Sequence, residues 1–246
     1  MGAKRPTEGV DVFRRIGMAL AELLTPDAEE LAEHYPTRME RAADSMVHAI
    51  GMIAALVGGG LLVAFALINR GVPMATASAI YALCLMAMLA ASAVYNLTKP
   101  SSNRRILRRI DEAAIFLMIA GSYTPFTIHN LTGAWAWGMT IAVWSIAAVG
   151  ALGKVLLIDV DRRLWVALYL ALGWLVVVAL KPMIDSVTST ALLLLLAGGV
   201  LYSTGVIFYV NKRLKFARAI WHGHVVAAAA TQWVAVLLGV VLASPR

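Results

Sequence analysis

The chain has 246 residues, of which 61% are hydrophobic and only 14% are charged, and its mean hydropathy is +0.78. Soluble domains carry about 25% charged residues, so this composition excludes a water-soluble globular protein. In lipid every backbone polar group must be paired internally, so only helices or closed barrels can span. The apolar runs here are continuous over about twenty residues and do not alternate, which predicts an all-α integral membrane protein.

The first 45 residues form the only sizeable polar stretch of the sequence. They hold nine of the fourteen acidic residues and six of the twenty-one basic ones. Apolar residues between Val10 and Leu23 recur at roughly helical spacing beside Arg14 and Arg15. We predict that residues 1–45 are a cytoplasmic N-terminal segment, either with an amphipathic helix on the membrane surface or as a partly ordered tail.

Seven apolar segments follow this polar stretch. Each is long enough to cross about 30 Å of hydrocarbon at about 1.5 Å per residue. Because the connections are short, helices that are neighbours in sequence are expected to be neighbours in space. We therefore predict a polytopic seven-transmembrane-helix bundle over residues 46–243, with helices at about 46–69, 74–97, 110–129, 134–153, 163–181, 187–210 and 219–243.

The basic residues lie almost entirely on one side of this bundle. Eighteen fall in the N-terminal segment and in the second, fourth and sixth connections, whereas only Arg70, Lys181 and Arg246 fall on the other side. The positive-inside rule then places the N-terminus in the cytoplasm and the C-terminus outside. The net charge of +7 is thus a topology signal, and we predict membrane lipids rather than nucleic acid as partners.

Polar residues at membrane depth are costly, so each is a candidate for function. Four helices carry such residues near their predicted cytoplasmic ends, and within each helix the spacing of four places most of them on one face. We predict a shared polar cavity open to the cytoplasm; the alternative is a set of unrelated interfacial residues. The residues are Asp44 and His48, Ser92 and Asn96, Asp111 and Glu112, and Arg218 and His222. His34 and His129 are expected to be solvated instead.

Several long motifs, in order, resemble the hemolysin III family, the bacterial branch of the progesterone and adiponectin receptor family. The resemblance runs from about Glu40 to about Trp233 and implies a seven-helix fold in a bacterial inner (plasma) membrane. The motifs are ERAADSMVHAIG (40–51), with Asp44 where the family has Asn, RRIDEAAIFLMIAGSYTPF (108–126), ALYLALGWLVVVALKPMI (167–184), GGVLYSTGVIFY (198–209) and AIWH (219–222).

The resemblance implies a zinc ion near the cytoplasmic side, held by one histidine of a Ser-x3-His motif and two of a His-x3-His motif. Ser92, Asp111 and His222 match the family's serine, its helix-three aspartate and its last histidine. The other two ligand positions hold Asn96 and Arg218. Catalytic zinc needs about three protein ligands, and an arginine brings a fixed positive charge. We therefore expect a degenerate metal site, which keeps His222 as a ligand but lacks the complete set of ligands.

Two functions follow from these departures. The first is a hemolysin III-like membrane protein that is non-catalytic and acts as a channel-like, membrane-perturbing (cytolytic) or lipid-sensing component. The alternative is a zinc-dependent hydrolase of lipid amides or esters, in which Asp111 and Ser92 support catalysis. No Gly-x-Ser-x-Gly motif occurs, which argues against a typical serine hydrolase.

The loss of ligands also suggests a role for Arg218. In one hypothesis its guanidinium replaces the metal and pairs with Asp111 or Glu112, while Asn96 and His222 complete a hydrogen-bonded cluster. In the other, Arg218 extends to the cytoplasmic interface as one more basic residue.

Overall fold

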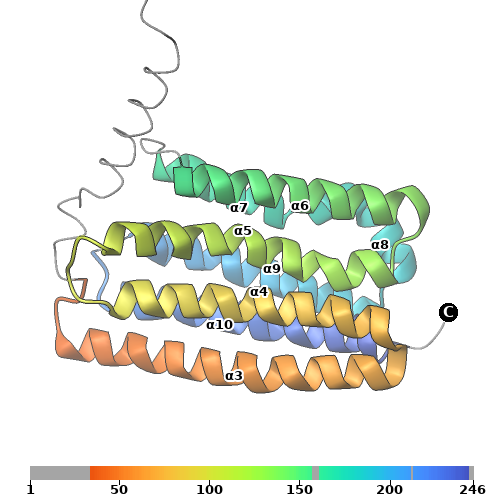
Figure 1. Ribbon diagram of the computed structural model, residues 1–246, viewed down its shortest axis with the longest axis horizontal. Helices are drawn as coiled ribbons and strands as arrows, with labels where there is room; N and C mark the ends of the chain where they lie inside the picture. Colours follow the sequence, from red (N-terminus) through yellow and green to blue (C-terminus); the bar gives the residue numbers. More distant parts are fainter. Residues whose placement is uncertain (1–33, 157–160, 212, 244–246) are drawn as a thin grey trace, which may run out of the picture.

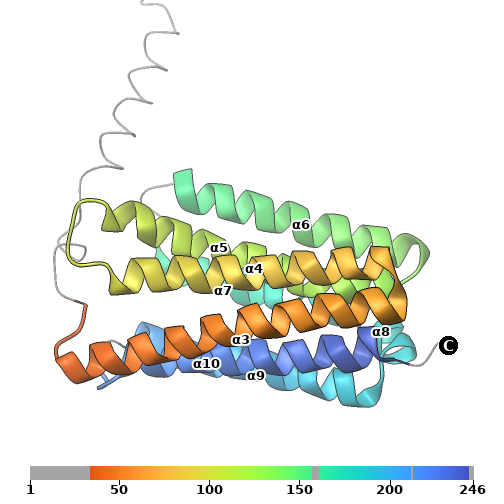
Figure 2. The ribbon, with the colours of Figure 1, turned by 60° about the horizontal axis from the view of Figure 1, so that its bottom comes forward.

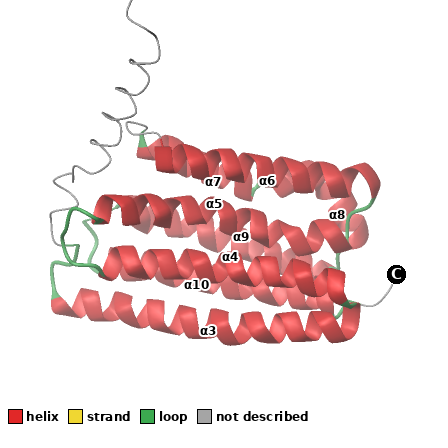
Figure 3. Cartoon of the chain, in the orientation of Figure 1, coloured by secondary structure: helices red, strands yellow, loops and turns green. Residues whose placement is uncertain are grey.

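A computed structural model describes residues 34–156, 161–211 and 213–243. The surface helix predicted between Val10 and Leu23 lies outside the described residues. Every regular element in the described ranges is helical, and the loops lie at the two ends of the bundle (Figures 1 and 3). The elements are α3 (Arg38–Arg70), α4 (Val72–Leu97), α5 (Arg104–His129), α6 (Gly133–Leu156), α7 (Arg162–Gly173), the 3₁₀ helix η1 (Leu175–Ala179), α8 (Leu180–Ser186), α9 (Ser189–Val210), α10 (Ala217–Val236) and the π-helix η2 (Leu237–Val241).

Among the described residues, six helical segments are long and apolar enough to cross a membrane. They are Arg38–Arg70, Val72–Leu97, Gly133–Leu156, Arg162–Ser186, Ser189–Val210 and Ala217–Val241. The seventh, α5, falls outside this set because its first turns carry six charged residues, but it packs between α4 and α6 within the bundle. The described chain is therefore an all-α polytopic membrane protein, and the prediction of this fold class is confirmed.

The order of the helices brings the first and last described helices, α3 and α10, together. Consecutive helices α3, α4, α5 and α6 pack side by side, and α10 lies against both α9 and α3 (Figure 2). Because neighbouring helices alternate in direction, α3 and α10 begin at the end of the bundle where α4 finishes and α5 starts. The polar residues predicted on these four helices are thereby placed at one end of the molecule.

The first helix begins well before its apolar stretch. Helix α3 starts at Arg38, and the Thr37 hydroxyl caps it by accepting a hydrogen bond from the Glu40 amide at 3.2 Å. A threonine cap satisfies one of the unpaired amides of the first turn. The extension places Asp44 in the second turn of a regular helix, where its side chain is fixed relative to the neighbouring helices.

The segment predicted as one helix over 163–181 is broken into α7, η1 and α8. The Tyr123 hydroxyl accepts a hydrogen bond from the Val176 amide at 2.8 Å and donates to the Gly173 carbonyl at 2.9 Å. Pro182 also lacks the amide that an α-helix would require at that position. Insertion of a neighbouring side chain into the backbone ladder is a known cause of such a break.

A close approach of α4 and α5 requires glycine at position 121. A Cβ atom at Gly121 would lie 2.7 Å from the Cβ atom of Cys84, whereas one at Gly60 would meet nothing within 4 Å. We expect Gly121→Ala to lower the unfolding free energy by about 1–3 kcal/mol through overpacking. Gly60→Ala, also within a helix, should be neutral or slightly stabilising. Denaturation by sodium dodecyl sulfate measures both, and equal stability of the two variants would contradict this packing.

Candidate functional site

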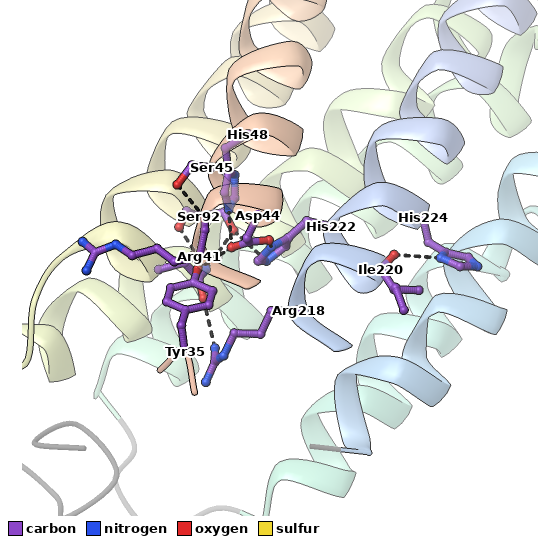
Figure 4. Close-up of polar contacts among 11 residues, drawn as sticks. Tyr35, Arg41, Asp44, Ser45, His48, Ser92, Arg218, Ile220, His222 and His224 are labelled. Carbon is purple, nitrogen blue, oxygen red and sulfur yellow. Dashed lines mark hydrogen bonds and ion pairs between the residues drawn. The ribbon is translucent and has the colours of Figure 1, made fainter. Parts of the chain in front are cut away.

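Asp44 is the centre of a buried polar cluster at the end of the bundle where α3 begins (Figure 4). Its carboxylate is fully buried and accepts hydrogen bonds from the Tyr35 hydroxyl and from Nδ1 of His222, the latter at 2.6 Å. Nε2 of His48, one helical turn further along α3, lies 3.5 Å from the same carboxylate. A buried carboxylate is stable only when donors surround it, and three side chains from three segments surround this one.

The other nitrogen of His222 faces helix α4. Its Nε2 lies 3.4 Å from the Ser92 hydroxyl oxygen. The Asn96 amide, one turn later on α4, donates to the Ser92 carbonyl at 3.0 Å and to its hydroxyl at 3.3 Å. A continuous chain of polar contacts therefore runs from α3 through α10 to α4.

Arg218 closes this chain from the first turn of α10. Its guanidinium donates a hydrogen bond to the Asn96 side-chain carbonyl at 3.1 Å. Helix α10 begins directly after Phe216, a residue other than glycine with left-handed backbone (φ 58°). Such a conformation costs about 1–2 kcal/mol. Arg218 and His222, four residues apart on α10, both reach α4, Arg218 at Asn96 and His222 at Ser92.

The two acidic residues of α5 have different partners. Asp111 lines the same cavity as Ser92 and Arg218. Glu112 instead forms an ion pair with Lys154 of α6, and it accepts a weak hydrogen bond from Tyr209 at 3.4 Å. Glu112, one of the two carboxylates expected to pair with Arg218, thus pairs with Lys154 instead.

The predicted polar residues line one cavity of about 540 Å³ at this end of the bundle. Of the polar residues predicted from the sequence, all except the fully buried Asp44 line its wall. Five basic side chains contribute to the wall, against three acidic ones. The basic residues are Arg108, Arg162, Arg213, Lys215 and Arg218, and the acidic ones are Glu40, Asp111 and Glu112.

A second, mostly apolar cavity of about 130 Å³ adjoins the first. The two cavities share four lining residues, Met88, Ile115, Tyr209 and Trp221. Beyond these, the second cavity lies among α5, α7 and α9 and is lined by residues such as Ile119, Val166 and Leu170. The polar chamber and the apolar chamber therefore meet at a common wall.

Two residues of the site were missed by the sequence analysis because they precede the first apolar segment. Tyr35 is buried, and its burial and the neighbouring Asp44 carboxylate raise the pKa of the phenol far above its ordinary value, so it remains a donor. His34 was expected to be solvated and this was wrong, because only 8% of it is exposed and its Nε2 lies 3.4 Å from the Tyr95 hydroxyl. The signal available was the aromatic pair His34 and Tyr35, which ends two residues before the helix cap Thr37.

Comparison with known proteins agrees with this architecture. The family model described as haemolysin-III related matches residues 40–233. This chain belongs to the haemolysin III family. It is 33% identical over 202 residues to the hemolysin-3 homolog of Bacillus subtilis strain 168, covering 82% of this chain and 94% of that protein. It is 30% identical over 198 residues to hemolysin-3 of Bacillus cereus, covering 80% of this chain and 90% of that protein.

The haemolysin III chain also has animal relatives. It is 30% identical over 207 residues to the human monocyte to macrophage differentiation factor, covering 82% of this chain and 84% of that protein. This match supports the relationship to the progesterone and adiponectin receptor family that the sequence motifs indicated.

The zinc ion implied by the family does not fit the residues at its expected position. Two of the three positions hold Asn96 and Arg218, and these side chains are hydrogen-bonded to each other. An arginine cannot lose its proton in a protein, so its guanidinium cannot act as a ligand. A dication at this point would face a fixed positive charge a few ångströms away in a partly desolvated site.

A different set of donors lies beside that position. Ligand atoms of Asp44, His48 and His222, all buried, lie within 4.8 Å of one another. Carboxylate and imidazole are suitable zinc ligands. However, the 2.6 Å contact between His222 and Asp44 is a hydrogen bond, and Asp44 also accepts from Tyr35. A metal ion bound there would have to replace these contacts.

Proposed function

We propose that this haemolysin III-family protein is a lipid-sensing protein that binds an anionic lipid within the bundle. The observation that supports the proposal is the shared wall of the two cavities, which joins a chamber with five basic side chains to an apolar chamber between helices. A lipid has the same division into a polar head and an apolar chain. Ligand sites are commonly apolar cavities with a few convergent polar groups.

Arg218 is the residue that we assign to the lipid head. It is half-buried, it lines the polar cavity, and its guanidinium donates a hydrogen bond to the neutral side chain of Asn96. A guanidinium is well suited to binding carboxylate or phosphate because its donors form a planar fork. The acyl chain would then pass Ile115 into the apolar cavity.

The orientation in the membrane is part of the proposal. The end of the bundle that carries the site also carries the basic connections of the described chain, whereas Arg70 and Lys181 lie at the other end. The positive-inside rule supports a cytoplasmic site and entry of lipid from the cytoplasmic leaflet. The bacterial relatives support a bacterial inner membrane. Of channel formation, membrane perturbation and lipid sensing, we select lipid sensing because the cavities give a lipid a place to bind.

Native mass spectrometry of the full chain in detergent tests this proposal. We expect phosphatidylglycerol to remain bound at lower concentration than phosphatidylethanolamine with the same chains. Ile115→Trp, which narrows the junction of the cavities, should abolish retention of both lipids. Arg218→Gln should remove only the preference for the anionic lipid, by about tenfold for a loss of about 1.4 kcal/mol.

The matched control is Arg163→Gln, which removes one basic charge from the same end of the bundle. Arg163 is exposed and does not line the cavity. If Arg163→Gln and Arg218→Gln reduce the lipid preference equally, the preference arises from general surface charge, and the assignment of the head to Arg218 is wrong. Retention unaffected by Ile115→Trp would contradict binding in the cavity.

A further inference from the structure

Three side chains of the cluster have the arrangement of a Ser-His-Asp triad, although they come from three helices. The Asp44 carboxylate holds Nδ1 of His222 at 2.6 Å, and Nε2 of the same ring lies 3.4 Å from the Ser92 hydroxyl oxygen (Figure 4). Asp44 is fully buried, and the exposed fractions of Ser92 and His222 are 8% and 7%. Ser92 and His222 line the 540 Å³ cavity, so a substrate in the cavity can reach them.

The hydrogen bonds fix the role of each nitrogen of His222. An ionised carboxylate only accepts, so the Nδ1 that contacts Asp44 carries the proton. In the neutral ring Nε2 is then an acceptor, and it faces a hydroxyl. This is the tautomer that a general base for serine requires, and a buried carboxylate is what holds it in that state. The Tyr35 hydroxyl, which also donates to Asp44, fixes the carboxylate in turn.

We propose that Ser92 is a nucleophile, with His222 as its general base and Asp44 as the positioning residue, and that the site cleaves carboxylic esters of acyl chains without a metal ion. The assignment of a lipid ester as substrate rests on the lipid site proposed above. The triad acts in place of the zinc chemistry implied by the family, because Asn96 and Arg218 occupy two of the three zinc-ligand positions. It has no Gly-x-Ser-x-Gly turn because each member is carried by a transmembrane helix.

The reaction consumes one water and releases one acid and one alcohol. The Ser92 oxygen attacks the ester carbonyl while its proton passes to Nε2 of His222. The tetrahedral intermediate then loses the alkoxide, which takes that proton from Nε2 and leaves as the alcohol. Water attacks the resulting acyl-serine and gives a proton to Nε2. The fatty acid then leaves, and Nε2 returns that proton to the serine oxygen.

Groups that stabilise negative charge adjoin the Ser92 hydroxyl. The Asn96 amide lies 3.3 Å from it, and the Arg218 guanidinium is bound to the other end of that amide. Donors and a positive charge at this point would stabilise the oxyanion of the tetrahedral intermediate. Asp111 lies on the same cavity wall as Ser92 and Arg218.

Covalent labelling with an alkyl fluorophosphonate tests this proposal directly. The Ser92 oxygen would displace fluoride from phosphorus, with the hydroxyl proton again passing to His222. We expect one adduct per chain in the folded, unmodified protein in detergent, and tandem mass spectrometry should place it on Ser92. Because the site of the adduct is read from the unmodified chain, the result does not depend on whether any variant folds. No adduct, or an adduct on another residue, overturns the proposal.

Variants then separate the roles. His222→Gln should lower the labelling rate at least about 100-fold, the usual size of a general-base contribution. Asp44→Asn should lower the maximal labelling rate at least about tenfold, because it misorients the His222 ring. The probe concentration that gives half the maximal rate should not change, because the cavity stays open. Ser45→Ala is the matched control: Ser45 adjoins Asp44 but its hydroxyl donates to the Arg41 carbonyl at 2.8 Å. An equal effect of Ser45→Ala would overturn the assigned roles.

Chelation distinguishes this mechanism from metal catalysis. Labelling of Ser92 and hydrolysis of a short-chain p-nitrophenyl ester should be unchanged after dialysis against 1,10-phenanthroline. Hydrolysis that is lost on chelation and restored by Zn²⁺ would overturn the metal-free mechanism and assign the reaction to a metal. Labelling needs no bound lipid, so failure of the lipid-binding experiment with successful labelling would reject the lipid site alone.

Discussion

Asp44→Ala is expected to lower the free energy of unfolding by about 3–5 kcal/mol, the cost of removing one partner from a buried ionic cluster. The carboxylate is fully buried and accepts from Tyr35 and His222, with His48 at 3.5 Å. Without it, these donors from three segments lose a shared acceptor inside the bundle. Unfolding by sodium dodecyl sulfate, followed by circular dichroism, measures the change.

Two further variants define the origin of that loss. Asp44→Asn keeps the volume and one acceptor oxygen, so it should cost less than Asp44→Ala. Ser45→Ala changes the next residue of α3, whose side chain is half-buried and bonded only to its own helix, and should be within about 0.5 kcal/mol of the unmodified protein. Asp44→Ala with a stability equal to that of Ser45→Ala would show that the cluster does not hold the helices together.

The double substitution Asn96→His, Arg218→His is expected to convert a protein with no zinc at the family position into one with nearly stoichiometric zinc. Positions 96 and 218 are already in contact through the 3.1 Å hydrogen bond of their side chains. Ser92 connects position 96 to His222 through contacts of 3.3 and 3.4 Å. The three positions converge, so only the chemistry of two side chains opposes a metal ion.

Elemental mass spectrometry of the purified proteins after dialysis measures this change. The single variant Asn96→His is the control, because it adds a ligand but keeps the guanidinium and should remain zinc-poor. Near-stoichiometric zinc in the unmodified protein would contradict the prediction and would point to Asp44, His48 and His222 as the ligands. No zinc in the double variant would show that the two positions do not reach a common centre with His222.

The sequence by itself determined the class of protein and predicted that its polar residues gather at one end of the bundle, where they line one cavity. Hydropathy is a property of continuous segments, so the apolar runs predict transmembrane helices without knowledge of their packing. Helical spacing likewise placed Asp44 with His48, and Arg218 with His222, on single faces. The motifs ending in His222 identified the family that the comparisons confirm.

The tertiary structure decided which of these faces meet. Helix rotation and tilt depend on contacts between distant segments, such as that of Gly121 with Cys84, and these leave no local pattern in the sequence. For this reason the pairing of Glu112 with Lys154 could not be predicted, nor could the entry of Tyr35 into the cluster. The same limit applies to the break in the fifth segment, which arises because a hydroxyl on α5 competes for its backbone hydrogen bonds.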